Sequence, residues 1–112
     1  MRIAIPTADG KLCLHFGHCQ QFTVVDVDPD TKSVVRTEQL TPPPHEPGVL
    51  PAWLKEQGVS VVIAGGMGAR AQQLFAASGI RIVTGAPSAS PSDLVAEFLE
   101  GTLTPGANPC DH

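Results

Sequence analysis

The sequence predicts an α/β domain with a mixed sheet of about five strands and helices packed against both of its faces. Two observations lead to this prediction. Residues 22–40 read as a β-hairpin, and two short, continuous apolar runs at 59–64 and 80–83 alternate with segments of helical periodicity. Such runs are typical of parallel strands that are buried on both faces and joined by right-handed helical crossovers.

The N-terminal half predicts a β-meander. Residues 2–6 read as the first strand, and the pair Asp9-Gly10 is a typical turn. Residues 22–28 and 33–40 are rich in β-branched side chains and predict two antiparallel strands, of which the second is exposed. Three consecutive prolines within residues 41–48 predict an extended linker.

The C-terminal half predicts three helices. Residues 49–57 form the first, and a second begins after Gly68 and ends near Gly79. The third opens with Ser90 as its N-cap and ends at Gly101. The domain should therefore span residues 1–101, and the polar segment 102–112 should be a flexible tail.

Composition excludes several classes of function. A length of 112 residues indicates one domain, and a net charge of −4 argues against nucleic acid or an anionic membrane as the main partner. No segment approaches the roughly 20 apolar residues of a membrane helix, and the N-terminus does not read as a signal peptide. We therefore expect a cytoplasmic protein, in which three cysteines are reduced thiols rather than a disulfide framework.

The stretch from Cys13 to Cys19 gathers two thiols and two imidazoles within seven residues. Its candidate metal ligands are Cys13, His15, His18 and Cys19. Thiolate and imidazole groups suit zinc, copper, iron and metal–sulfur units, although the spacing differs from that of a zinc finger. The alternative is that both cysteines point into the core while the histidines are turn residues.

Two weaker patterns lie elsewhere in the chain. Cys110 and His112 could form a second ligand pair at the end of the tail, or could belong to a terminus without a role. Asp26 and Asp28 share one face of a predicted strand and could bind Mg²⁺ for nuclease chemistry. No general base stands near them in the sequence, which disfavours the nuclease interpretation.

The glycine-rich segment Gly65-Gly66-Met67-Gly68 joins a buried strand to a helix. Its glycines would let a ligand approach the backbone, and the free amides of the first helical turn attract anions. Arg70 could add a positive charge, and Met67 could offer a thioether. The segment formally fits the dinucleotide-binding pattern, but the acidic residue expected after the next strand is missing. A tight strand-to-helix turn without a ligand is the alternative.

These motifs together resemble the dinitrogenase iron–molybdenum cofactor biosynthesis family. The family includes nitrogenase accessory domains of the NifX and NifY type, the C-terminal domain of many NifB proteins, and stand-alone members such as the orange protein of sulfate reducers. The resemblance rests on the Ile-Ala-Ile strand, His15–Cys19 with Phe22, the hairpin with Asp26, Ala64–Gly68, Gly79-Ile80 and Gly85.

The resemblance implies a ribonuclease H-like, three-layer α/β/α fold that lacks the nuclease carboxylates. It also implies a protein that binds or carries a metal–sulfur cofactor or its precursor, with molybdenum and iron or copper, and that is not an enzyme. A cluster-donor or cluster-acceptor protein would be its partner. Family members often have Arg where this chain has His18, so the resemblance does not specify the type of metal centre.

We therefore predict a cluster site between the Cys13–Cys19 stretch and the helix that starts after Gly68. The second interpretation is a mononuclear zinc- or copper-binding or regulatory module that uses the same Cys and His ligands. The predicted cofactor-binding residues are Gly65, Gly66, Met67, Gly68 and Arg70. The predicted metal ligands are Cys13, His15, His18, Cys19, Cys110 and His112.

Overall fold

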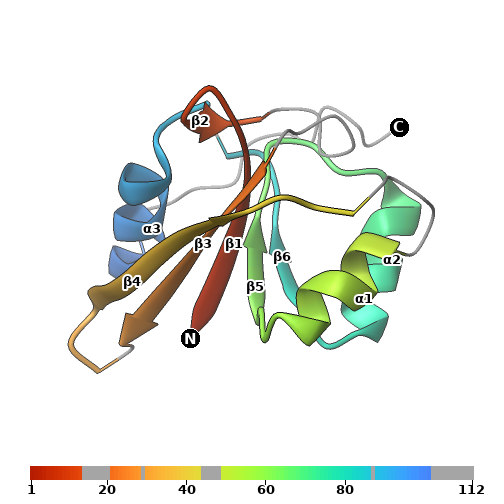
Figure 1. Cartoon of the computed structure of the whole chain (residues 1–112), viewed down its shortest axis with the longest axis horizontal. Coiled ribbons are helices and arrows are strands. Elements are labelled where there is room, and N and C mark those ends of the chain that lie inside the picture. The colour runs from red at the N-terminus through yellow and green to blue at the C-terminus, as the bar shows by residue number, and fades with distance from the viewer. Residues whose placement is uncertain (14–20, 29, 44–48, 87, 102–112) are drawn as a thin grey trace.

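The computed structural model describes residues 1–13, 21–28, 30–43, 49–86 and 88–101. These residues form a mixed sheet between two helical layers (Figure 1). The strands are β1 (Arg2–Ala8), β2 (Lys11–Leu12), β3 (Gln21–Asp28), β4 (Ser33–Leu40), β5 (Val61–Ile63) and β6 (Arg81–Val83). The helices are α1 (Val49–Glu56), α2 (Ala69–Ala77) and α3 (Pro91–Glu100). Within the described residues, no helix is long and apolar enough to cross a membrane.

The sheet has the order β4-β3-β1-β5-β6, and β2 pairs with β1 outside this path. β1, β5 and β6 are parallel, whereas β3 runs antiparallel to both β1 and β4. The predicted mixed α/β class is confirmed, but the sheet that the described residues form has six strands rather than five. The additional strand, β2, has only two residues and is too short to show periodicity in the sequence. The ribonuclease H-like description stays a prediction.

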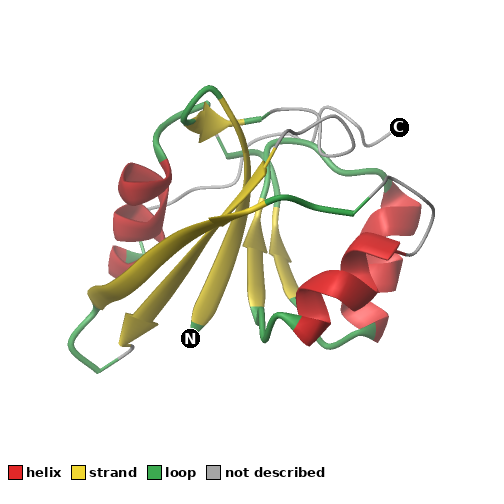
Figure 2. Ribbon diagram, in the orientation of Figure 1, coloured by secondary structure: helices red, strands yellow, loops and turns green. Residues whose placement is uncertain are grey.

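Alternation along β1 divides the interior into two hydrophobic cores. Ile3 and Ile5 point to one face, where they join Leu94 of α3 in one cluster. Ala4 points to the other face and joins the cluster that contains Phe75 of α2 and residues of α1. Figure 2 shows the resulting arrangement, with α3 on one side of the sheet and α1 and α2 on the other. The sheet is therefore covered on both faces, as the continuous apolar runs predict.

Local signals place the ends of the helices where the sequence predicts them. The amide of Asp93 donates to Ser90 Oγ (3.3 Å), which makes Ser90 the N-cap of α3. Gly101 ends this helix with a φ of 75°, a left-handed conformation that glycine adopts without steric cost. Pro51 lies in the first turn of α1, where its missing N–H costs no helical hydrogen bond.

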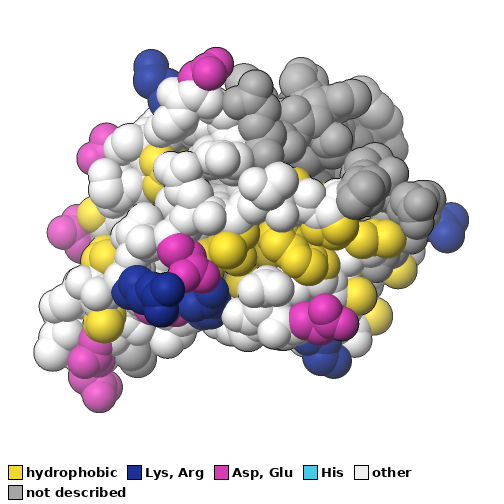
Figure 3. All heavy atoms as spheres, viewed as in Figure 1, with side chains coloured by type: hydrophobic (Ala, Val, Ile, Leu, Met, Phe, Trp, Pro, Cys, Tyr) yellow, Lys and Arg dark blue, Asp and Glu magenta, His cyan; other side chains and the backbone are white. Residues whose placement is uncertain are grey.

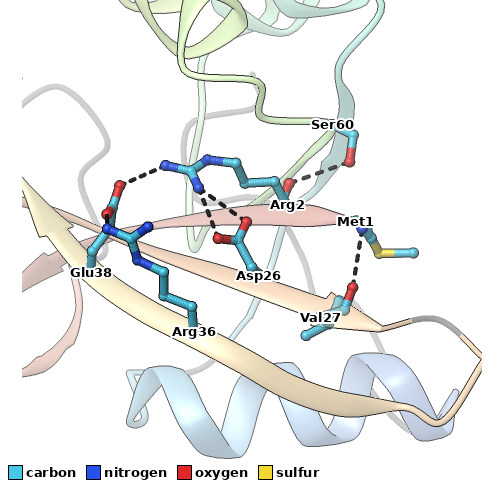
Figure 4. Close-up of polar contacts among 7 residues, drawn as sticks. All are labelled: Met1, Arg2, Asp26, Val27, Arg36, Glu38 and Ser60. Carbon is cyan, nitrogen blue, oxygen red and sulfur yellow. Dashed lines mark hydrogen bonds and ion pairs between the residues drawn. The ribbon is translucent and has the colours of Figure 1, made fainter.

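A charged network joins three neighbouring strands at the amino end of β1 (Figure 4). Arg2 donates to both carboxylate oxygens of Asp26 (3.0 and 2.9 Å) and to Glu38 (2.6 Å). Partial burial alone would lower the pKa of Arg2, but its hydrogen bonds to Glu38 and Asp26 and the charges of both carboxylates raise that pKa overall. The guanidinium therefore stays charged and links β1, β3 and β4.

Replacement of Phe75 by alanine tests the core between the sheet and α2. Phe75 is fully buried, so we expect Phe75→Ala to lower the free energy of unfolding by about 3–5 kcal/mol through lost burial and a cavity. Gln73→Ala, an exposed position on the same helix, is the matched control and should change it by less than about 0.5 kcal/mol. Denaturant unfolding measures both values, and equal effects of the two substitutions would contradict this packing.

Candidate functional site

The candidate site lies at the carboxyl end of the sheet, where β1, β5 and β6 all terminate. These strands are parallel neighbours, so the segments that follow them emerge at the same end. They are residues 9–13 after β1, 64–68 after β5 and 84–86 after β6, and Figure 1 shows this end at the top. In open α/β sheets, ligands bind outside the carboxyl ends of the strands.

A tight turn brings Cys13 to this end. Asp9 and Gly10 both have positive φ values, 55° and 79°, as a two-residue hairpin turn requires. The turn folds β2 back onto β1, and the amide of Cys13 then donates to the carbonyl of Pro6 (2.8 Å). On its other side, β2 is held by the amide of Leu12, which donates to the carbonyl of Ala89 (3.0 Å). Cys13 is half-buried; its own amide bonds to β1, and the preceding Leu12 bonds to the segment before α3.

The predicted glycine-rich segment follows β5 and forms a turn that backbone hydrogen bonds hold in place. The amide of Gly85, after β6, donates to the carbonyl of Gly65 (2.7 Å). Gly65 and Gly66 are buried, and Met67 is buried in the hydrophobic cluster under α1 and α2. Met67 thus contributes to the core, whereas Gly68 is exposed.

The first turn of α2 has no side-chain cap. Its N-cap is Gly68, with φ −63° and ψ 154°, and the first turn contains no acidic residue. The exposed Arg70 lies in the same turn. In α3, by contrast, Ser90 caps the helix and Asp93 lies in the first turn. The amides and partial positive charge of α2 are therefore suited to an anion, and Arg70 adds a full positive charge.

Only part of the predicted ligand set can be placed. Of the six predicted metal ligands, Cys13 alone belongs to the described residues, and the other five lie outside them: His15, His18, Cys19, Cys110 and His112. Within residues 1–13, 21–28, 30–43, 49–86 and 88–101, no three His, Cys, Asp or Glu side chains form a group that could hold a metal ion. Cys13 and Gln21, the described residues on either side of 14–20, both lie at the carboxyl end of the sheet.

Asp26 and Asp28 have structural roles that disfavour the nuclease interpretation. Both carboxylate oxygens of Asp26 accept hydrogen bonds from Arg2, so this group is already neutralised by a cation. Asp28 Oδ1 accepts from the amide of Asp30 (2.9 Å), a contact typical of a turn. Neither carboxylate has the environment of a hydrolytic magnesium ligand.

Sequence reasoning missed two polar groups near this end of the sheet. Thr7 and Thr23 are each 3% exposed, and their hydroxyl oxygens lie 3.2 Å apart. Gln72 Nε2 donates to the carbonyl of Met67 (2.9 Å) and so ties α2 to the preceding turn. These contacts give buried or half-buried polar atoms their hydrogen-bond partners, and we assign them a structural role only.

Comparison with known proteins agrees with the motifs. A family model described as dinitrogenase iron-molybdenum cofactor matches residues 1–101. The crystal structure of PH0822 is 34% identical with a TM-score of 0.84, and the match covers 93% of each chain. The apo form of the orange protein from Desulfovibrio gigas is 27% identical with a TM-score of 0.74, and the match covers 96% of this chain and 94% of that one.

A curated relative from Methanocaldococcus jannaschii is also similar to this chain. The uncharacterized protein MJ0580 of Methanocaldococcus jannaschii is 29% identical over 107 residues, which cover 92% of this chain and 89% of the relative. The family match spans nearly the whole sequence and confirms the resemblance that the His-Phe-Gly and Gly-Gly-Met-Gly motifs predict. The chain therefore belongs to the dinitrogenase iron-molybdenum cofactor family.

Proposed function

We propose that this protein binds and carries a metal–sulfur cofactor, or a precursor of one, and catalyses no reaction. Membership of the family and likeness to the orange protein support a role related to such cofactors. The structural roles of Asp26 and Asp28 agree with a binding protein rather than a nuclease. The metal–sulfur species is the cargo of the protein in this proposal.

The observation on which the proposal rests is the uncapped start of α2 at the carboxyl end of the sheet. Metal–sulfide units are anionic, and an anion is stabilised by the amides and dipole of a helix N-terminus. Gly68 leaves those amides uncovered by a side chain, and Arg70 adds a charge in the same turn. Gly65 and Gly66 are buried. In this proposal they form the turn that positions the start of α2 and do not contact the ligand themselves.

The metal itself requires softer ligands than backbone amides. We assign this role to thiolates and imidazoles of Cys13, His15, His18 and Cys19, with Cys110 and His112 as a further pair from the tail. In this proposal residues 1–101 form the cofactor-binding domain, and residues 102–112 reach it as an accessory segment. The metals are molybdenum with iron or copper, and a donor or acceptor protein exchanges the cluster.

Reconstitution tests the class of cargo. Anaerobic protein is treated with thiomolybdate plus copper, or with molybdate, iron and sulfide, and is then separated from excess reagent. We expect a coloured protein that retains metal and acid-labile sulfide together. A colourless, metal-free sample would rule the proposal out. Stoichiometric zinc or copper without sulfide would instead establish the mononuclear module.

Substitution of Gly68 by aspartate tests the anion site separately from the fold. The backbone angles of Gly68 suit any residue, and an added Cβ meets no atom within 4 Å. Aspartate is a favoured N-cap, so we expect Gly68→Asp to keep or slightly raise stability. Its charge should weaken retention of thiomolybdate about two- to fivefold, because a charge at an exposed helix N-terminus contributes about 0.3–1 kcal/mol.

The matched control for this variant is Ser92→Asp, which adds the same charge to the exposed first turn of α3. It should bind thiomolybdate like the wild type. Retention is measured by equilibrium dialysis, and stability by denaturant unfolding of the same samples. If Gly68→Asp retains thiomolybdate as well as Ser92→Asp does, the start of α2 has no part in binding.

A further inference from the structure

β4 forms one end of the strand order and pairs with β3 alone among the described strands. It has eight residues, and most of its side chains are exposed. Val34 is 50% exposed and Val35 is 70% exposed, which is unusual for large apolar side chains at the border of a sheet. A long edge strand presents a row of N–H and C=O groups to which another strand can add.

The hydrogen-bond register shows which backbone groups of β4 point outward. Met1 and Val27 exchange both of their backbone hydrogen bonds (2.9 and 3.1 Å), so the odd-numbered residues of β3 bond to β1. The even-numbered residues of β3 therefore bond to β4, where their partners include Arg36 and Glu38. Thr37, between these two residues, directs its N–H and C=O away from β3.

The charges beside Thr37 make the strand complementary to itself. Arg36 and Glu38 lie on one face and contact each other (2.6 Å), and Glu38 also contacts Arg2 (Figure 4). Figure 3 shows acidic and basic side chains gathered on the face that β4 presents. An antiparallel copy related by a two-fold axis at Thr37 would place Arg36 opposite Glu38 of the second copy, and Glu38 opposite its Arg36.

Neighbouring registers lack this complementarity. A shift that centres the axis on Arg36 places two arginines directly opposite each other, and a shift that centres it on Glu38 places two glutamates opposite each other. Like charges at directly opposite positions destabilise a pair of strands, whereas opposite charges stabilise it. The β-bulge places Val34 opposite Val27 and Arg36 opposite Asp26, so these two β4 side chains lie on opposite faces of the sheet and the charged pairs around Thr37 decide the register.

We propose that β4 pairs antiparallel with β4 of a second copy of this chain, about a two-fold axis at Thr37. The two sheets then form one continuous sheet, in which the outward N–H and C=O groups of Thr37 are paired. The bulge between Asp26 and Val27 of the β3–β4 pair limits the regular part of the ladder to the region around Thr37. The carboxyl-end site is not part of this interface, so the dimer is independent of the proposed cargo.

Sedimentation velocity over a wide concentration series tests the dimer. We expect the wild-type protein to reach twice its 11.7 kDa mass. Arg36→Glu leaves the contacts of Arg2 in place but puts one glutamate opposite each Glu38. It should therefore weaken dimerisation about tenfold or more. Lys55→Glu makes the same change of charge at an exposed position of α1, and this variant should dimerise like the wild type.

Two further variants separate register from general charge effects. Glu38→Arg alone should also weaken dimerisation, because it places an arginine opposite each Arg36. An equal mixture of Glu38→Arg and Arg36→Glu should form a heterodimer, because both opposing pairs are then of opposite charge. Thr37→Pro removes an outward N–H without removing a bond to β3 and should give a folded monomer. A monomeric wild type would overturn the proposal. So would normal dimerisation of both Arg36→Glu and Thr37→Pro, or a dimer that forms through an element other than β4.

Discussion

Burial of β1 on both faces is the constraint on which the rest of the structure depends. Its alternate residues divide the interior into two cores, with Ile3 and Ile5 under α3 and Ala4 under α1 and α2. Its two sides pair with β3 and β5, and its last residues also pair with β2. The strand therefore fixes both the layers of the fold and the end at which the segments after β1, β5 and β6 emerge.

The starts of α2 and α3 differ in the side chains that stabilise them. At the start of α3, Ser90 accepts a hydrogen bond from a backbone amide of the first turn, and the carboxylate of Asp93 offsets the positive end of the helix dipole. The start of α2 has neither, although Gly68 leaves space for a side chain. In the proposed function, an anionic ligand takes the place of a side-chain cap at the start of α2.

Much of the fold could be predicted because its signals are local. The bounds of β4, the N-cap Ser90 and the left-handed Gly101 follow from adjacent residues. β2 could not be predicted, because two residues carry no periodicity and this strand depends on the turn that precedes it. The contacts of Arg2 with Asp26 and Glu38 depend on strand order and register, which the hydrophobic pattern of one sequence does not specify.

In the candidate site, the glycine turn and the start of α2 follow from residue order. The clustering of Cys and His ligands around Cys13 belongs to the proposed function. Spacing in a sequence does not specify whether imidazoles and thiolates lie close together, because that depends on tertiary structure. The most direct measurement is metal and acid-labile sulfide analysis, with an absorption spectrum, of protein purified anaerobically from its own host. The account predicts molybdenum with iron or copper, sulfide, and visible absorption; metal without sulfide, or a colourless metal-free protein, would contradict it.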